Sequence, residues 1–480
     1  MSSRSFDIIR AISLKGIKKI NFFYISLFKK HKFPNQDKQI LSEYYLSREI
    51  IFPDFLCQAP FNNMYFASDG NVSACCYNRS LNYGNIYEQS LSEIWNGKKR
   101  KQLAESILKY NLSDGCQACQ NAIQEKSFSI VLARDHDYSP IFKDYPSSIE
   151  FELSNQCNLQ CIMCNEQLSS KHADSLVQQI NSNEKFLDEL IPYLQKLKRA
   201  KFLGGEPFLI PIYYQIWQKL VQINPSCNII IQTNGTILND EIKTLLEKGK
   251  YHIGISLDSL NKDNYEKIRK GANFDKVMQN LHFFNSYCKL NNTVFSIACC
   301  PMQQNWKELP DIISFCNKYN IALLFNRVTQ PKNASLMYLH SSELQKIYDD
   351  LSKHKFYGKS YCAYRNKIQY ESLLEEIKSW QKKAKKKEER SHQLATLDIA
   401  VLEQMIIEEL IANKEIDSEE KKERISNKIK FIINHFSKRN EYKTFLINIY
   451  LFSKEYLIRA LLDRNETDIL KKAEQIFYPD

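Results

Sequence analysis

Strand and helix patterns alternate six times between residues 148 and 328, and this alternation restricts the fold more than any other feature of the chain. The strand-like segments lie at 148 to 154, 200 to 205, 228 to 234, 252 to 258, 293 to 299 and 321 to 328. Amphipathic helical segments such as EKFLDELIPYLQKLKR and FDKVMQNLHFFNSYCKL lie between them. Strands that alternate with helices form a parallel sheet with crossover helices, so the sequence predicts an α/β fold.

A cysteine triplet follows directly after the first of these strands. Cys157, Cys161 and Cys164 lie in the segment CNLQCIMC. Three thiolates can hold a 4Fe-4S cluster by three of its irons, which leaves the fourth iron open for chemistry. A structural zinc ion needs four closed ligands. The spacing therefore favours an iron-sulfur site, with a zinc knuckle or buried thiols as the alternatives.

The cysteine triplet and a glycine turn together resemble the radical S-adenosylmethionine (radical SAM) enzymes. After the second strand, FLGGEP supplies Gly204, Gly205 and Glu206, which in that family meet the amino group of the methionine moiety. Met163, before the third cysteine, occupies a position that contacts adenine through its backbone in the family. The resemblance implies a partial (β/α)6 TIM-like barrel, a SAM-binding 4Fe-4S cluster and S-adenosylmethionine.

Further candidate residues follow the ends of the later strands. Active sites of β/α barrels collect at the carboxyl ends of strands, where Asn234, Ser256 and Asp258 lie. Ser256 and Asp258 alternate along one strand, so both can face a ribose. In similar enzymes an arginine at the position of Arg269 meets the methionine carboxylate. The alternatives are a helix-capping role for Asp258 and a surface position for Arg269.

A second cysteine set lies before the predicted barrel. Cys57, Cys75, Cys116 and Cys119, with the segment GNIYEQSLSEIWN, resemble the SPASM and twitch auxiliary-cluster domains of radical SAM enzymes. The resemblance implies a second, auxiliary 4Fe-4S cluster closed by these four thiolates. Cys76 is the alternative ligand to Cys75. A zinc ion held by the same four thiolates is the alternative to a cluster.

Four regions follow from these patterns. Residues 1–50 form a basic segment, 51–125 a SPASM/twitch-like domain, 145–335 the radical SAM partial barrel, and 340–480 a helical accessory region. In the first region Ile17, Ile20, Tyr24 and Phe28 are spaced as on an amphipathic helix. Such a helix packs on the protein or lies peripherally on a membrane.

The bulk composition restricts the class of protein. Much of the net charge of +11 lies in runs such as residues 97–101 and 382–390, and the second run is typical of a solvated helix face or a linker. No aromatic and basic motif accompanies them, so we expect no nucleic-acid binding. The fourteen cysteines group in metal-binding spacings, and no apolar stretch is long enough to span a bilayer. These features predict a cytoplasmic protein without a transmembrane segment.

The resemblance implies reductive cleavage of S-adenosylmethionine to a 5'-deoxyadenosyl radical that abstracts hydrogen from a substrate, with electrons from a donor such as flavodoxin or ferredoxin. Because an auxiliary domain accompanies a helical region, a peptide or protein is the expected substrate, giving oxidative modification or cross-linking. A small-molecule radical dehydrogenase and a non-catalytic iron-sulfur or zinc protein that binds partners are the alternatives. Cys299, Cys300 and Cys362 are candidate hydrogen-atom donors, and buried inert thiols are the alternative for all three.

Overall fold

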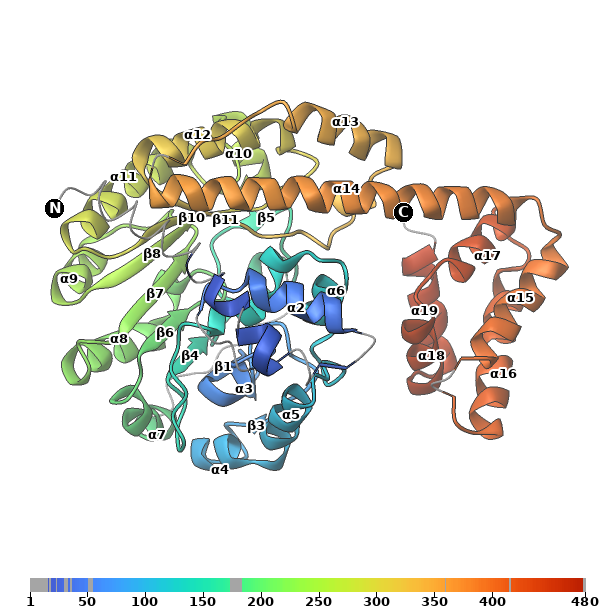
Figure 1. Cartoon of the computed structure of the whole chain (residues 1–480), viewed down its shortest axis with the longest axis horizontal. Helices are drawn as coiled ribbons and strands as arrows, with labels where there is room; N and C mark the ends of the chain where they lie inside the picture. Colours follow the sequence, from blue (N-terminus) through green and yellow to red (C-terminus); the bar gives the residue numbers. More distant parts are fainter. Residues whose placement is uncertain are drawn as a thin grey trace. The chain divides into compact units, whose positions relative to one another are not determined.

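The computed structural model describes residues 16, 19–22, 24–29, 33–34, 37–50, 55–172, 184–358, 360–413 and 416–477. Figure 1 shows the chain from the N-terminus in blue to the C-terminus in red. It divides into two compact units. The first comprises Met1–Leu339 and Leu344–Ser379, and the second comprises His340–Glu343 and Trp380–Asp480.

The first unit is built on a nine-stranded sheet with the strand order β11-β10-β8-β7-β6-β4-β1-β2-β3. Its six parallel barrel strands are β4 (Ser148–Phe151), β6 (Arg199–Phe202), β7 (Asn228–Thr233), β8 (Tyr251–Ser256), β10 (Phe295–Cys299) and β11 (Ala322–Phe325). Each strand overlaps one of the six predicted segments, with ends that differ by up to three residues, and the predicted α/β fold class is confirmed.

Three strands of the cysteine-rich region extend the same sheet. They are β1 (Asn63–Phe66), β2 (Asn71–Ser73) and β3 (Gly84–Asn85). β1 pairs in parallel with β4, so that Tyr65 lies opposite Glu150 and Phe66 opposite Phe151. The predicted SPASM/twitch-like region, residues 51–125, therefore shares one continuous sheet with the predicted barrel.

Helices cover one face of this sheet. They are α7 (Glu184–Leu194), α8 (Pro211–Ile223), α9 (Asp240–Lys248), α10 (Lys262–Ile268), α11 (Phe274–Leu290) and α12 (Leu309–Tyr319). The helix-facing core contains a row of aromatic rings from neighbouring strands. The ring centroids of Phe66 and Phe151 lie 5.7 Å apart, and those of Phe151 and Phe202 lie 4.9 Å apart. This continuous row of rings packs β1 against the barrel core. Buried aromatic pairs add stability beyond the area they bury, so the row stabilises this junction.

Short helices complete the cysteine-rich region and its connection to the barrel. They are α2 (Lys38–Ser47), α3 (Ala59–Asn62), α4 (Leu91–Asn96), α5 (Lys98–Leu108), α6 (Gln117–Gln124), η3 (Phe128–Ile130) and η4 (Leu132–His136). A capping box between Ser90 and Glu93 begins α4. The basic run 97–101 lies mainly on α5, where its lysines are exposed.

The N-terminal helix prediction falls only partly on described residues. Ile17 lies outside them, and nothing is described for the side chain of Phe28. Ile20 is exposed and Tyr24 is half-buried. Asn21 is buried and donates a hydrogen bond to the carbonyl of Ile50 at 2.7 Å. No helix among the described residues has both the length and the apolar character needed to cross a bilayer.

The first part of α14 (Tyr361–Ala395) connects the last strand to the cysteine-rich region. Asn366 accepts a hydrogen bond from the Leu323 N–H of β11 at 2.8 Å. Glu376 forms an ion pair with Arg327 just past β11, and its carboxylate also accepts from Ser129 of η3. This part of α14 therefore contacts segments that belong to the two ends of the open sheet.

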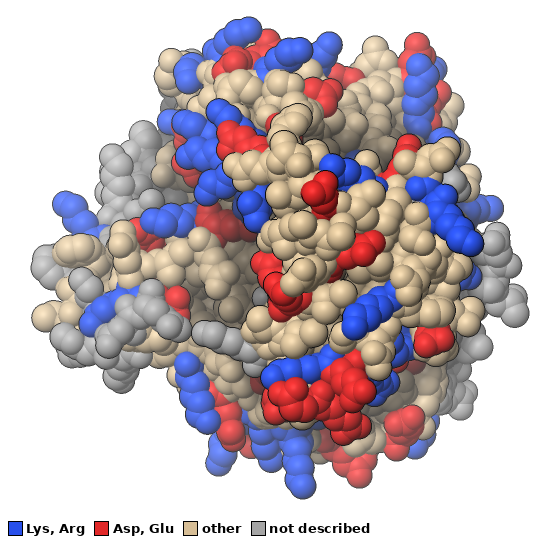
Figure 2. All heavy atoms as spheres, turned by 90° about the vertical axis from the view of Figure 1, so that its right-hand side faces the viewer, with Lys and Arg blue, Asp and Glu red and all other residues tan. Residues whose placement is uncertain are grey.

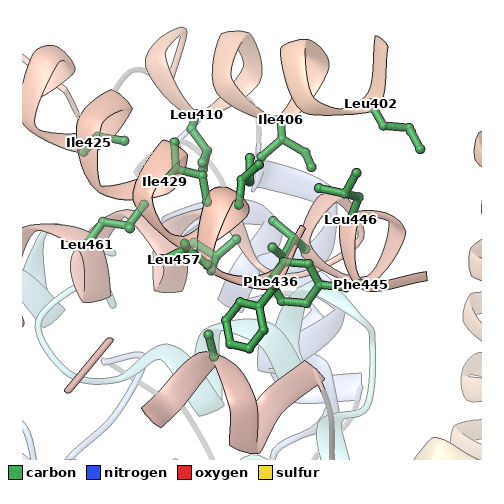
Figure 3. Packing of buried hydrophobic residues seen from close by; sticks show 14 of the residues in the cluster. Leu402, Ile406, Leu410, Ile425, Ile429, Phe436, Phe445, Leu446, Leu457 and Leu461 are labelled. Carbon is green, nitrogen blue, oxygen red and sulfur yellow. The ribbon is translucent and has the colours of Figure 1, made fainter. Parts of the chain in front are cut away.

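The second unit is a helical bundle. It contains the end of α14 with α15 (Ile399–Ile411), α16 (Glu419–Phe436), α17 (Tyr442–Tyr450), α18 (Lys454–Asp463) and α19 (Glu466–Phe477). Its isoleucine and leucine side chains converge on a buried core, in which Leu402, Ile429 and Leu446 are among the residues drawn in Figure 3. Helix α13 (Ser341–Leu351) begins in this unit, where Glu388 accepts from the Ser341 N–H at 2.8 Å.

Charged side chains of both signs are interspersed over the face drawn in Figure 2. The run at 382–390 lies on α14, and most of its side chains are exposed, which confirms the predicted solvated helix face. Ion pairs of the bundle surface such as Arg439 with Glu474 are partly exposed, so each contributes little stability.

The buried core of the bundle leads to a prediction about its stability. Replacing the fully buried Leu446 with alanine removes a large side chain and leaves a cavity, which costs about 2–5 kcal/mol. We expect Leu446→Ala to lower the hydrogen-exchange protection of α15 to α17. The exposed Val401→Ala in the same unit is the matched control and should stay within about 0.5 kcal/mol of the wild type. Equal protection in both variants would contradict this core assignment.

Candidate functional site

The cysteine triplet lies in a loop held at both ends. A short strand, β5 (Gln160–Cys161), pairs antiparallel with β9 (Arg269–Lys270), so that Cys161 lies opposite Arg269. At the start of the loop, the Cys157 N–H donates to the Ser170 hydroxyl at 3.1 Å. Cys161 and Cys164 are hydrogen-bonded through their thiols, and each also interacts electrostatically with Cys157. The three thiols therefore converge.

Arg269 lies directly against this thiol group. Its Nη1 atom donates to the Cys161 sulfur at 3.8 Å, and its Nη2 atom is 2.7 Å from Oδ2 of Asp258. The hydrogen bond from Cys164 and the Arg269 guanidinium lower the pKa of Cys161 to about 7, against the opposing effect of burial. The opposite shift falls on the other two thiols: the hydrogen bond with Cys161 raises the pKa of Cys164, and burial raises the pKa of Cys157. Arg269 therefore favours the thiolate form at Cys161, and a thiolate is the form that binds iron.

The glycine turn packs against the start of the cysteine loop. Gly204 and Gly205 both have positive φ, at 85° and 20°. A Cβ atom on Gly204 would lie 2.5 Å from the Ser154 carbonyl oxygen, and one on Gly205 would lie 1.9 Å from that of Gln156. Only glycine allows this backbone approach. The Glu206 N–H then donates to the Gln156 carbonyl at 2.7 Å, which fixes the turn to the loop.

Glu206 connects the glycine turn to the end of β7. Its fully buried carboxylate accepts from the Thr233 hydroxyl at 2.6 Å and from the Asn234 N–H at 2.7 Å. Burial raises its pKa to about 7, although these hydrogen bonds oppose the rise. In this arrangement the side chain positions the turn, and its role as a SAM contact stays a prediction.

Asn234 lies beside the first cysteine. Its Nδ2 atom donates to Asn158 at 2.9 Å and is 3.9 Å from the Cys157 sulfur, and its Oδ1 atom accepts from the Thr236 hydroxyl at 2.7 Å. Asn158 and Thr236 are therefore neighbours of the site that the sequence analysis missed. Their polar side chains in a loop carry no spacing signal.

The remaining predicted SAM contacts differ in accessibility. Asp258 is completely buried, and its carboxylate is engaged by Arg269 and by the Cys300 N–H at 2.7 Å. Ser256 is half-buried, and its hydroxyl accepts from Gln232 at 3.2 Å. Met163 packs partly buried beside the apolar cluster of Ile268 and Met302. Of these three, Ser256 and Met163 are open to a ligand, and all three assignments stay predictions.

The four upstream thiols also face one another. Cys57 precedes α3, Cys75 follows β2, Cys116 is the N-cap of α6, and Cys119 lies within α6. Burial raises the pKa of Cys57, and the neighbouring Cys119 and Cys116 raise it further. Cys75 is likewise affected by burial and by Cys57 and Cys119. Residues far apart in the sequence therefore form one group of thiols.

Cys76 faces a different environment from Cys75. Burial, and next the Glu150 carboxylate, raise the pKa of Cys76 to about 12. Glu152 also raises this pKa, whereas Lys201 and Arg79 lower it. Its side chain therefore neighbours the charged residues of β4 and β6. This arrangement supports Cys75 as the ligand, and the assignment stays a prediction.

The three candidate hydrogen-atom donors lie in two places. Cys300 neighbours Asp258, Arg269 and Cys161. Cys299 is fully buried next to Cys316, which also interacts with Cys362. Cys300 thus interacts directly with Cys161 of the triplet, and Cys299 shares its neighbours Asp258 and Arg269. The catalytic role of all three cysteines stays a prediction.

A charged group on the inward face of the sheet was not predicted. Glu150 and Glu152 alternate with the helix-facing Phe151, and Lys201 lies opposite Glu150 in the β4-β6 register. Arg199 lies on the same face as Lys201, and its Nη1 atom is 3.8 Å from Oε1 of Glu150. Charged residues inside a parallel strand are unusual. Glu150 and Lys201 inside β4 and β6 could therefore have indicated this polar face from the sequence.

Both thiol groups suit iron-sulfur clusters. The triplet offers three converging thiols with a guanidinium beside them, and the upstream group offers four. Among the described residues, no three His, Cys, Asp or Glu side chains come close enough to enclose a single metal ion. All fourteen cysteines are free thiols.

Two protein-family models match the chain. The model of the radical SAM superfamily matches residues 151–316, and the model of the SPASM iron-sulfur cluster-binding domain matches residues 57–120. The matched domains imply a 4Fe-4S cluster with S-adenosylmethionine at the first site and an auxiliary iron-sulfur cluster at the second. Both were predicted, and both are confirmed as cofactors.

Among curated proteins, the chain is similar to GTP 3',8-cyclases. The protein of Clostridium perfringens (strain SM101) is 28% identical over 185 residues, which are 37% of this chain and 54% of that protein. A probable GTP 3',8-cyclase of Methanocaldococcus jannaschii is 28% identical over 175 residues, covering 35% of this chain and 54% of that protein. The chain thus spans about half the length of these relatives.

Two solved structures are also similar. Native anSMEcpe with bound AdoMet matches with a TM-score of 0.34 and 20% identity, over 43% of this chain and 59% of that chain. Streptococcus suis SuiB bound to precursor peptide SuiA matches with a TM-score of 0.33 and 14% identity, over 56% of this chain and 53% of that chain.

The close approach at Gly205 leads to a prediction about the triplet site. Gly205→Ala forces the Gln156 carbonyl to move and displaces the cysteine loop. We expect the variant to lose the iron of one 4Fe-4S cluster after anaerobic reconstitution, measured by iron and sulfide analysis. The control is Gly271→Ala, which also has positive φ but meets no atom closer than 3.5 Å. Equal iron contents in the two variants would contradict the proposed packing.

The different surroundings of Cys75 and Cys76 lead to a second prediction. Cys75→Ser should remove the auxiliary cluster and so about half of the iron, because four thiolates close a 4Fe-4S cluster. Cys76→Ser serves as the matched control and should keep the full iron content. The reverse result would assign Cys76 as the ligand. Zinc at the site in the wild-type protein, with one cluster per chain, would refute the auxiliary cluster.

Proposed function

Because the chain belongs to the radical SAM superfamily and carries a SPASM iron-sulfur domain, we propose that it abstracts hydrogen from a peptide or protein substrate. Cys157, Cys161 and Cys164 would hold the SAM-binding cluster, and Cys57, Cys75, Cys116 and Cys119 the auxiliary cluster. When bound, the cluster and S-adenosylmethionine supply a 5'-deoxyadenosyl radical as the hydrogen-abstracting agent.

The residues around the triplet prepare the site for this chemistry. Arg269 places positive charge beside the Cys161 sulfur and is itself oriented by Asp258. A hydrogen bond to a ligating sulfur and its burial both influence a cluster's reduction potential. Gly204 and Gly205 lack a Cβ atom and so let the backbone of the turn approach the cysteine loop closely. Glu206 connects this turn to the end of β7 through its hydrogen bond with the Asn234 N–H.

The charge balance near the auxiliary thiols is the observation that carries the choice of a peptide. Three carboxylates, Asp135, Glu150 and Glu152, are matched by three cations, Arg79, Arg199 and Lys201. A fourth cation beside Asp135, Arg134, is paired with Glu49. A nucleoside triphosphate, the substrate class in the names of the curated relatives, carries several negative charges and needs an excess of cations. A peptide segment without net charge matches this balance.

An auxiliary cluster next to the substrate offers a route for an electron. Cys75 interacts electrostatically with Glu150, and Cys119 interacts with Asp135. A substrate held on the inward face of β4 and β6 would therefore lie near the auxiliary thiols. An auxiliary cluster held by Cys57, Cys75, Cys116 and Cys119 would supply an acceptor for the second electron of a net oxidation of the substrate.

The protein needs a reducing partner and a reducing compartment. Thiols that ligate clusters must stay reduced, and the cysteines of this chain form no disulfide. We therefore propose a cytoplasmic location and a low-potential electron donor such as a flavodoxin or ferredoxin.

The decisive assay follows SAM and substrate separately. Reduced, reconstituted protein should form 5'-deoxyadenosine from S-adenosylmethionine, and Cys157→Ala should abolish this activity. In parallel, candidate precursor peptides and GTP are each incubated with the enzyme and the products are examined by mass spectrometry. We expect a mass change in a peptide and none in GTP.

The other outcomes support the alternatives. A cyclised GTP product would replace the peptide proposal with the activity named for the relatives. Turnover of small alcohols alone would identify a radical dehydrogenase. If the reduced wild-type protein forms no 5'-deoxyadenosine, the chain is a non-catalytic iron-sulfur protein.

A further inference from the structure

We propose that His136, Glu150 and Arg199 bind a carboxamide group of the substrate, either a peptide bond or the side chain of Asn or Gln. The site lies on the inward face of β4 and β6, next to the auxiliary thiols. This inference rests on the proposed function, because it specifies which chemical group of a peptide the enzyme holds.

The site contains buried polar atoms that lack partners within the described chain. His136 and Glu150 are each 1% exposed. Neither ring nitrogen of His136 has a hydrogen-bond partner among the described residues, nor does Oε2 of Glu150 or Nη1 of Arg199. Leaving buried polar atoms unsatisfied is costly, and native proteins rarely do so without a ligand or water to satisfy them. Three such side chains from three elements therefore indicate a missing polar partner.

These side chains come together from separate parts of the fold. Glu150 is in the middle of β4, Arg199 begins β6, and His136 ends η4. The Glu150 Oε1 and Arg199 Nη1 atoms are 3.8 Å apart, which is too long for a hydrogen bond between them. Both residues act electrostatically on His136. The three side chains therefore share one neighbourhood, in which the Glu150 and Arg199 atoms leave room for a polar group between them.

The chemistry of the three side chains matches an amide. Glu150 offers an acceptor to an N–H group, and Arg199 offers a donor to a carbonyl oxygen. Burial lowers the pKa of His136, so the neutral ring provides one donor and one acceptor. The side chains facing His136 are Glu150, Arg199, Asp135 and Lys201, whose charges balance. A neutral group with one donor and one acceptor fits better than an anion.

Exposed residues adjoin the buried group. Asp135, adjacent to His136 in the chain, is exposed. Tyr77 is 54% exposed and interacts electrostatically with Asp135 and with Cys76. Lys201 is half-buried on the same face. We infer that a substrate approaches from the side of Tyr77 and Asp135.

The test measures binding of small amides to the reconstituted, unreduced holoenzyme without S-adenosylmethionine. Saturation-transfer NMR follows N-acetylglycine N-methylamide as the peptide-bond probe, acetamide as the primary carboxamide probe, and inorganic triphosphate as the anionic probe. We expect one or both amides to bind and triphosphate not to bind. Preference for the first amide identifies a peptide bond, and preference for acetamide identifies an Asn or Gln side chain.

Two variants test the residues themselves. Glu150→Gln should weaken amide binding about tenfold, because it replaces a charged acceptor with a neutral amide oxygen, which accepts a weaker hydrogen bond. His136→Phe should abolish binding while keeping or raising the unfolding temperature, because it removes an unpaired buried imidazole. Glu308→Gln, which makes the same change at a carboxylate that accepts from Ser259 and Asn264, is the matched control and should bind like the wild type.

The result that overturns the inference is equal amide binding in Glu150→Gln, His136→Phe and the control, or no amide binding to the wild type. If Glu150→Gln does not fold, Arg199→Gln replaces it with the same expected loss. Because the binding test requires no SAM cleavage, its failure is distinct from a failure of the proposed function. If the wild-type protein binds amides but forms no 5'-deoxyadenosine, the proposed enzymatic function is refuted and the proposed amide-binding site is supported.

Discussion

The parallel pairing of β1 with β4 is the contact on which the rest of the candidate site depends. It places the cysteine-rich region next to the strand that leads into the cysteine triplet. It also puts Tyr65 opposite Glu150 on the inward face, and Phe66 opposite Phe151 on the helix-facing side. Because strand register is specified wherever one face is buried, the aromatic row fixes which side chains face inward. The auxiliary thiols thereby gain a defined position relative to β4.

The two faces of the sheet have different functions. The helix-facing side is aromatic and aliphatic, from Phe66 through Phe151 to Phe202, and supplies the packing energy. The inward side carries ion pairs such as Arg79 with Glu152 and the unpaired polar atoms of Glu150 and His136. Buried polar groups lower stability when they lack partners. Their retention at the center of the sheet is therefore better explained by ligand binding than by folding.

The sequence predicts the local patterns well and the long-range contacts poorly. The six barrel strands follow from periodicity, although β4 ends at Phe151 rather than at residue 154, because the chain turns there into the cysteine loop. The joining of β1 to β4 involves a strand of four residues paired across more than eighty positions, which no periodicity reveals. The pairing of Arg269 with Asp258 and Cys161 is also a tertiary contact, whereas the sequence offers only an arginine after a helix.

The position of Arg269 connects the cysteine triplet to charged residues elsewhere in the fold. Its guanidinium is held between the Asp258 carboxylate and the Cys161 sulfur, and β9 brings its backbone into register with that cysteine. Asp258 in turn accepts from the Cys300 N–H, so the end of β10 is connected to the same network. A change at Asp258 thus reaches Cys161, a predicted cluster ligand, through two contacts, and a change at Cys300 reaches it through three. The triplet, which alone specifies only an iron-sulfur loop, acquires its electrostatic environment from residues more than ninety positions away.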